Sequence, residues 1–184
     1  MDRKEFSEFY DQNIDKVFRF IFLRVDSSET AQDLTSLVFL KFWQNASLRN
    51  ASQKQGNKTI SNPKAFLFQI ARNQIIDFYR QKNKKTVSLD ELAEQGIEIP
   101  QTSFAFEIEL SVEMENLKKI IQNLKPAYSE VIIWYYIDNL SIKEISEILN
   151  KRENNVRVLL HRALETLKKE VEKKNSGLCD FASH

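Results

Sequence analysis

The chain has 184 residues, 42% of them hydrophobic and 29% charged, with only three glycines and three prolines, which predicts a mostly helical globular protein. Its apolar runs fall short of the ~18 residues that a membrane-spanning helix needs, and the single cysteine excludes a disulfide within one chain. The net charge of +1 hides a segregation along the chain, because residues 41–85 carry ten basic and one acidic residue whereas residues 86–117 carry eight acidic and no basic ones.

The first 43 residues predict two helices separated by a short break. Residues 4–24 carry apolar side chains at helical spacing, and cap-type residues follow at 26–28. Residues 29–43 form the second helix, whose inner stripe is Leu34, Leu37, Val38 and Phe42. Three further apolar residues fall outside this stripe: Phe39, Leu40 and Trp43. Either this helix is buried on two sides of its own bundle, or these residues form an exposed patch that binds another protein.

A polar stretch at 45–63 is predicted to be a long loop, and it leads into a third helix. Pro63 stands at a favoured first position of a helix, and residues 64–82 continue with apolar side chains at helical spacing. The opposite flank of this helix combines basic, polar and aromatic residues: Arg72, Asn73, Asp77, Tyr79, Arg80 and Lys82. Such a flank can bind phosphates and stack on unpaired bases. A solvated charged face is the plainer alternative.

Residues 84–110 have weak periodicity and predict a flexible, strongly acidic linker. A second helical domain follows over residues 111–174. One of its helices ends before Pro126, and the next contains Val131, Ile132, Tyr135 and Tyr136. Residues 175–184 are expected to be a frayed tail.

Residues 140–167 predict two helices joined by a tight turn. Ser141 and Glu144 have the spacing of a capping box that begins the first helix, and Asn150 suits the left-handed cap that ends it. A second helix from Glu153 has an apolar stripe and leaves a polar row facing outward: Asn154, Arg157, Val158, His161 and Arg162. This is the plan of a helix-turn-helix, whose second helix enters the DNA major groove. An αα-hairpin with a solvated face is the alternative.

The sequence has no glycine-rich phosphate loop, no cysteine–histidine metal spacing and no paired-histidine motif. His161 is placed on the polar flank of a helix, where a surface or DNA-contacting role fits better than catalysis. We therefore expect a protein without enzymatic activity, cofactor or metal. The charged start of the sequence is unlike a signal peptide, so the cytoplasm is the expected compartment.

Two segments resemble a known family. The stretch AQDLTSLVFLKFWQ (31–44), followed by NPKAFLFQIARNQIIDFYRQ (62–81), is similar to region 2 of bacterial sigma factors of the sigma-70 family. The stretch 124–169, which contains the predicted helix-turn-helix, is similar to region 4 of the same family. The absence of recognisable regions 1 and 3, together with the length, resembles the small extracytoplasmic-function (ECF) group. The resemblance spans nearly the whole chain, and the segments come in the family's order.

The resemblance implies a role for each of these surfaces. The helix at 29–43 would dock on the coiled-coil clamp of the largest polymerase subunit through Asp33, Leu34, Thr35, Val38, Phe39 and Trp43. The helix at 64–82 would face the unpaired bases of the minus-10 promoter element through Arg72, Asn73, Asp77 and Arg80, with Tyr79 and Lys82 beside them. The loop at 45–63 would capture bases. The second helix of region 4 would read the minus-35 duplex through Asn154, Arg157, Val158, His161 and Arg162.

The sequence thus predicts an all-α protein of two small helical domains. A region-2-like domain at 1–83 and a region-4-like helix-turn-helix domain at 111–174 are joined by the flexible acidic linker at 84–110, and a tail at 175–184 follows. The expected function is to direct bacterial RNA polymerase to specific promoters, with core polymerase and promoter DNA as partners. The resemblance also allows an anti-sigma factor as a partner, and no membrane insertion is expected. Two alternatives stay open: an autonomous helix-turn-helix regulator, and a sigma-like protein that sequesters core polymerase.

Overall fold

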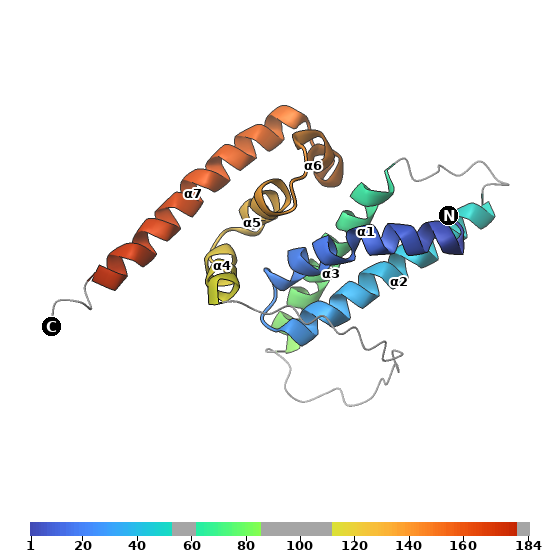
Figure 1. Cartoon of the computed structure of the whole chain (residues 1–184), viewed down its shortest axis with the longest axis horizontal. Coiled ribbons are helices and arrows are strands. Elements are labelled where there is room, and N and C mark those ends of the chain that lie inside the picture. The colour runs from blue at the N-terminus through green and yellow to red at the C-terminus, as the bar shows by residue number, and fades with distance from the viewer. Residues whose placement is uncertain (53–61, 86–111, 180–184) are drawn as a thin grey trace.

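A computed structural model describes residues 1–52, 62–85 and 112–179, which form helices and turns with no strand among them. The first half of the chain contains α1 (Arg3–Phe22), α2 (Ser28–Ser52) and α3 (Pro63–Lys85). The second half contains α4 (Val112–Gln122), α5 (Pro126–Ile132), the π-helix η2 (Ile133–Ile137), α6 (Ile142–Leu149) and α7 (Glu153–Cys179). The predicted all-α class, with a helix-turn-helix in the second domain, is confirmed (Figure 1).

Helices α1, α2 and α3 pack on one another around a largely aromatic interior. Asp2 begins α1 with a capping box, in which its side chain accepts a hydrogen bond from the Glu5 backbone N–H at 2.8 Å. Phe42 of α2 stacks on Phe9 of α1, with ring centroids 4.8 Å apart, and lies 6.0 Å from Phe66 of α3. Helix α2 therefore packs against both α1 and α3.

Helix α2 is longer than the sequence predicts. It runs to Ser52, so the predicted loop at 45–63 is helical over residues 45–52, while residues 53–61 lie outside the described part of the chain. The next helix begins at Pro63, as predicted. Asn62 caps it, because its side-chain oxygen accepts a hydrogen bond from the Ala65 backbone N–H at 2.9 Å.

The local signals of the helix-turn-helix are confirmed. Ser141 Oγ accepts from the Glu144 backbone N–H at 3.2 Å, and the Glu144 carboxylate accepts from the Ser141 backbone N–H at 2.8 Å, which completes the capping box. Asn150 ends α6 in the left-handed region, at φ 51° and ψ 48°. Helix α7 runs past the expected start of the tail to Cys179, and residues 180–184 lie outside the described ranges.

A π-helical turn follows α5, and no sequence pattern indicated it. The Asp138 backbone N–H donates to the Ile133 carbonyl, five residues earlier, at 2.9 Å. Within this turn Trp134 is fully buried, whereas Tyr135 and Tyr136 face solvent. The turn therefore presents one large aromatic side chain to the first half of the chain.

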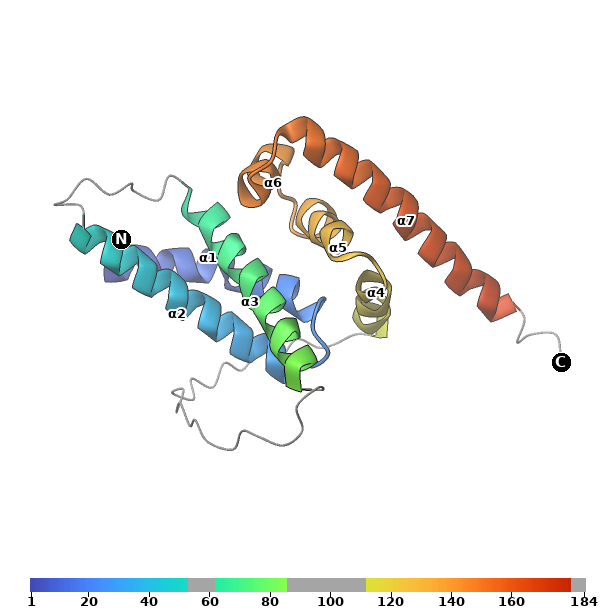
Figure 2. The ribbon, with the colours of Figure 1, turned by 180° about the vertical axis from the view of Figure 1, so that it is seen from behind.

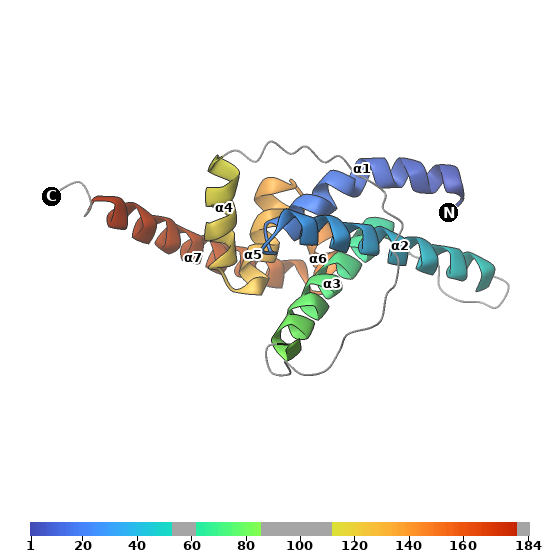
Figure 3. The same cartoon turned by 90° about the horizontal axis from the view of Figure 1, so that it is seen from below.

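The two halves of the chain are in direct contact. Trp134 stacks on Phe20 of α1 with centroids 5.0 Å apart, and meets Phe68 of α3 edge-on at 6.1 Å. Seen from below, α5 and α6 lie beside α1 and α3 (Figure 3), while the end of α7 projects away from the rest (Figure 2). Residues 86–111, which hold most of the predicted linker, lie outside the part of the chain that the structure describes. The sequence predicted two domains but not the face through which they pack.

Candidate nucleic-acid and polymerase interfaces

The outward face of α7 is open to solvent. Every residue predicted to read the minus-35 element is exposed on it: Asn154, Arg157, Val158, His161 and Arg162. Arg157 donates to Asn154 Oδ1 and to the Glu153 carboxylate, each at 2.9 Å. Surface ion pairs of this kind contribute at most about 1 kcal/mol. Arg157 can therefore exchange its carboxylate partner for a DNA group at little cost.

The contact between the two halves of the chain covers part of the polar flank of α3 and leaves the rest exposed. Asn73, Asp77 and Arg80 are exposed. Arg72 instead lies against the second half, where its Nε donates to both carboxylate oxygens of Glu130 at 2.9 and 3.0 Å. One of the residues predicted to contact minus-10 DNA thus already holds an anionic group from its own chain.

Tyr79 and Lys82, on the same flank, have partners within the first half. The Tyr79 hydroxyl donates to the Arg24 carbonyl at 2.6 Å, and burial raises the pKa of this phenol above its usual value. The Lys82 ammonium pairs with Asp26, and this hydrogen bond raises the pKa of Lys82. The Tyr79 ring is fixed against the turn between α1 and α2, whereas the exposed Lys82 can exchange Asp26 for a phosphate.

A buried ion pair beside Arg72 was missed by sequence reasoning. Arg24 Nη1 lies 3.2 Å from Glu130 Oε1, and the two residues are only 8% and 1% exposed. Burial lowers the pKa of the Arg24 guanidinium, and the Glu130 carboxylate opposes that shift. The one available signal was a glutamate inside the apolar run that follows Pro126, since a charge in such a run needs a partner.

Two more ion pairs join the halves. Arg19 Nε donates to Asp138 Oδ1 at 3.0 Å, and burial raises the pKa of Asp138 although the guanidinium lowers it. Lys64 Nζ donates to Glu144 Oε1 at 2.7 Å. Partial burial raises the pKa of Glu144, but hydrogen bonds from Lys64 and Ser141 outweigh that effect and bring it to about 2. Basic residues of the first half therefore face acidic residues of the second.

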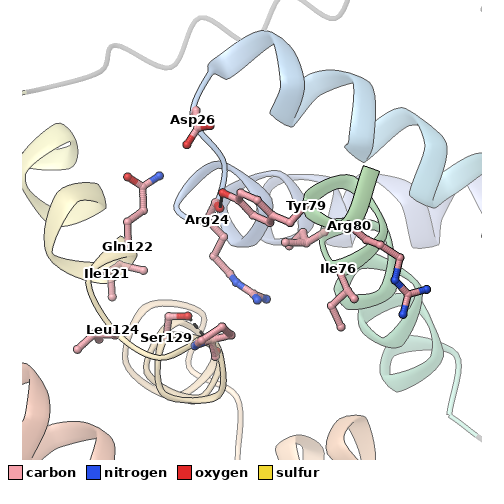
Figure 4. Close-up of a pocket in the computed structure, with 11 residues that line it drawn as sticks. Arg24, Asp26, Ile76, Tyr79, Arg80, Ile121, Gln122, Leu124 and Ser129 are labelled. Atoms are coloured by element: carbon pink, nitrogen blue, oxygen red, sulfur yellow. Dashed lines mark hydrogen bonds between the residues drawn. The ribbon is translucent and has the colours of Figure 1, made fainter. Parts of the chain in front are cut away.

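A cleft of about 630 Å³ opens next to this contact (Figure 4). The first half lines it with Arg24, Ile76 and Tyr79, and the second half lines it with Ile121 and Leu124. Its walls come from both halves, so it exists only while they are in contact.

Most of the residues predicted to bind core polymerase through α2 are buried. Leu34, Thr35, Val38 and Phe39 are between 0 and 7% exposed, and the Phe39 ring lies 4.6 Å from that of Tyr10 in α1. The interpretation of Phe39 as part of an exposed aromatic patch is therefore wrong. Trp43 is half-buried against Phe6, with centroids 4.7 Å apart.

The exposed face of α2 is formed by other residues. Asp33 is exposed, and Leu40, seven residues later, has 48% of its surface exposed. Residues seven apart lie on the same side of a helix. This seven-residue spacing can be read from the sequence. It places Leu40, but not Phe39, on the same side of α2 as the exposed Asp33.

Neither a metal site nor a membrane span is found within the described ranges. No group of three histidine, cysteine, aspartate or glutamate side chains there is arranged to hold a metal ion. None of the helices described is both long and apolar enough to cross a bilayer.

The sequence matches two models of one protein family, in the order of that family's regions. Sigma-70 region 2 matches residues 9–85, which contain most of α1 and all of α2 and α3, and Sigma-70 region 4 matches residues 114–167, which contain the predicted helix-turn-helix. The chain belongs to the sigma-70 family of sigma factors. The region 2 half therefore carries α3 with its basic flank, and the region 4 half carries the open face of α7.

Relatives of known type place this sigma factor in the ECF group. It is 29% identical over 161 residues to the ECF RNA polymerase sigma factor SigM of Bacillus subtilis (strain 168), which covers 88% of this chain and 91% of the relative. It is 28% identical over 175 residues to the RNA polymerase sigma factor YlaC of the same organism, which covers 93% of this chain and 94% of the relative.

A solved structure shares the fold. The sigma factor RpoE in complex with the anti-sigma factor NepR, from Bartonella quintana, matches with a TM-score of 0.65 at 20% identity, over 92% of this chain and 98% of that one. The prediction of a sigma-70 family member of the ECF group is confirmed.

Proposed function

We propose that this sigma factor directs bacterial RNA polymerase to specific promoters through three separate surfaces. The exposed α2 face around Asp33 and Leu40 binds core polymerase, the α3 flank with Arg72 and Arg80 takes the melted minus-10 strand, and the open face of α7 reads the minus-35 duplex. The observation that carries the proposal is the order of the family regions in one chain, with a helix-turn-helix whose reading face is free.

The partners follow from these surfaces. Core polymerase and promoter DNA are required for the function, and the work is done in the cytoplasm, where both are found. An anti-sigma factor is a third proposed partner, supported by the shared fold with RpoE, which was solved in complex with one.

The direct test is transcription in vitro with purified core polymerase on a library of randomised promoters. We expect the chain to select templates that share two short elements at a fixed spacing, because α3 and α7 each contribute one. A chain that bound a duplex site tightly by itself but gave no transcripts with core polymerase would instead be an autonomous regulator. A chain that bound core polymerase and suppressed all transcription would be a sequestering protein.

Substitutions on α7 should change the preferred minus-35 sequence. Arg157→Ala and His161→Ala remove groove-facing side chains, which carry ~1–3 kcal/mol of discrimination between bases. Lys82→Ala removes a positive charge that reads no base, and should weaken transcription from all promoters alike. The same promoter library measures both effects. If both α7 variants select the wild-type minus-35 sequence, α7 does not read that element.

A further inference from the structure

The cleft between the two halves has the size and lining of a site for a small molecule. Its volume of about 630 Å³ lies within the range of about 300–1,000 Å³ that is usual for such sites. Ile76 and the Tyr79 ring line it from the region 2 side, and Ile121 and Leu124 line it from the region 4 side (Figure 4). The two walls can therefore hold an apolar molecular body between them.

A buried cation points into this cleft. Arg24 is 8% exposed, and its guanidinium lies between the wall formed by α3 and the wall formed by α4 and α5 (Figure 4). Its Nη1 stands 3.2 Å from Glu130 Oε1 but has no hydrogen-bond partner among the described residues. Buried donors in folded proteins are nearly always paired with a protein group, an ordered water or a ligand. The Arg24 guanidinium therefore has hydrogen-bonding capacity left for a molecule in the cleft.

The charges around Arg24 are not balanced. The Glu130 carboxylate that it contacts also binds Arg72, at 2.9 Å, so that two guanidiniums share one anion. Asp26 lines the cleft as well, but it is paired with Lys82. Burial lowers the pKa of Arg24, and Glu130 opposes this shift while Arg72 adds to it. One further negative charge beside Arg24 would balance the cluster.

We propose that this cleft binds a small amphipathic carboxylate, with its anionic group at Arg24 and its apolar body between Ile76 and Leu124. A single negative charge matches the excess at Arg24, whereas a phosphate would bring a second charge that has no partner in a largely apolar cleft. Because the ligand contacts walls from both halves, it binds only while they are in contact and stabilises that arrangement. This binding is separate from the proposed promoter-directing function.

The test titrates the full chain with 2-naphthoate and with 2-naphthamide by isothermal calorimetry. The two probes share an aromatic body, and only 2-naphthoate carries a negative charge at neutral pH. We expect one molecule of 2-naphthoate to bind roughly tenfold or more tightly than 2-naphthamide, because it adds a charge-assisted hydrogen bond. At one hundred times its dissociation constant, 2-naphthoate should also raise the melting temperature by about 5–10 °C.

Two substitutions place a negative charge on opposite walls. Ile76→Glu acts from α3, where Ile76 is 41% exposed. Pro126→Glu acts from the exposed first position of α5, where an acidic residue suits the helix dipole. Each should weaken binding of 2-naphthoate roughly tenfold or more, and binding of 2-naphthamide less. Val171→Glu is the matched control, because it adds the same charge at an exposed apolar position of α7 outside the cleft, and it should bind both probes like wild type.

Arg24→Gln removes the cation and should abolish the preference for 2-naphthoate over 2-naphthamide. The ratio of the two affinities is the readout, because a general loss of structure would weaken both probes together. Far-ultraviolet circular dichroism shows whether each variant is folded. If Arg24→Gln does not fold, the two probes with the wall variants decide the proposal.

The results that would overturn the proposal are distinct. Wild type that does not bind 2-naphthoate, or binds both probes equally, contradicts it, and so does a preference that survives in folded Arg24→Gln. A loss in only one of the two wall variants would mean that the ligand does not lie between the halves. An equal loss in Val171→Glu would reflect general charge. Because none of these measurements involves polymerase or DNA, their failure leaves the proposed function standing, and transcription in vitro tests that function independently.

Discussion

Replacing Trp134 with alanine is expected to lower the free energy of unfolding by about 3–5 kcal/mol, the range for a fully buried tryptophan. The side chain has no exposed surface and packs on rings from α1 and α3. No hydrogen-bond partner for its indole N–H is found among the described residues. The expected loss of stability therefore comes from apolar packing, and the packing that is lost lies in the contact between the two halves of the chain.

The same change should make unfolding less cooperative. Buried residues of region 2 and region 4 form one continuous core, and Trp134, the largest of the fully buried side chains described, lies where the two regions meet. Without it, urea unfolding followed by far-ultraviolet circular dichroism should show two steps where wild type shows one. Trp43→Ala is the matched control, because Trp43 is half-buried and the ring described against it, Phe6, belongs to the same half. If Trp134→Ala and Trp43→Ala lowered the free energy of unfolding equally and both kept a single unfolding step, the contact between the halves would not depend on Trp134.

Features that depend on neighbouring residues were predictable from the sequence. The Ser141–Glu144 capping box, the left-handed Asn150 and the outward row of α7 each require only residues within a few helical turns. Local hydrogen bonding and helical period determine them, whatever the rest of the chain does. The open face of α7 was therefore predicted residue by residue.

Features that depend on distant segments were not predictable. Arg24 and Glu130 are more than a hundred positions apart, and nothing beside either one identifies the other. The same holds for Phe39, which is covered by Tyr10 of another helix. Helical period could separate Phe39 from the inner stripe of α2, but it could not show that α1 covers that second side.

The burial of Phe39 against Tyr10 changes where we place the polymerase-binding surface of α2. We propose that Asp33 and Leu40 form its centre, because both are exposed and lie seven residues apart on one side of the helix. Leu40 is the large apolar side chain that α2 exposes within its described residues. Phe39 supports this surface from inside by fixing α2 against α1.

Phe39→Ala should therefore destabilise the protein, whereas changes at Asp33 and Leu40 should weaken binding. Loss of a buried phenylalanine costs about 3–5 kcal/mol, so Phe39→Ala should melt at a clearly lower temperature. Asp33→Ala and Leu40→Ala remove exposed side chains and should keep the wild-type melting temperature. At the centre of an interface each should cost about 2 kcal/mol of affinity for core polymerase, roughly a thirtyfold loss.

Two measurements on the same set of variants separate these effects. Thermal melting reports stability, and titration of labelled sigma factor with purified core polymerase, well below the melting temperature, reports affinity. Lys41→Ala is the control, since Lys41 is exposed on a neighbouring side of α2. If Lys41→Ala weakens binding as much as Asp33→Ala, the loss reflects general charge and not a defined surface. If Phe39→Ala melts like wild type but binds poorly, the ring leaves its contact with Tyr10 to meet the polymerase, and the surface proposed from α2 exposure is misplaced.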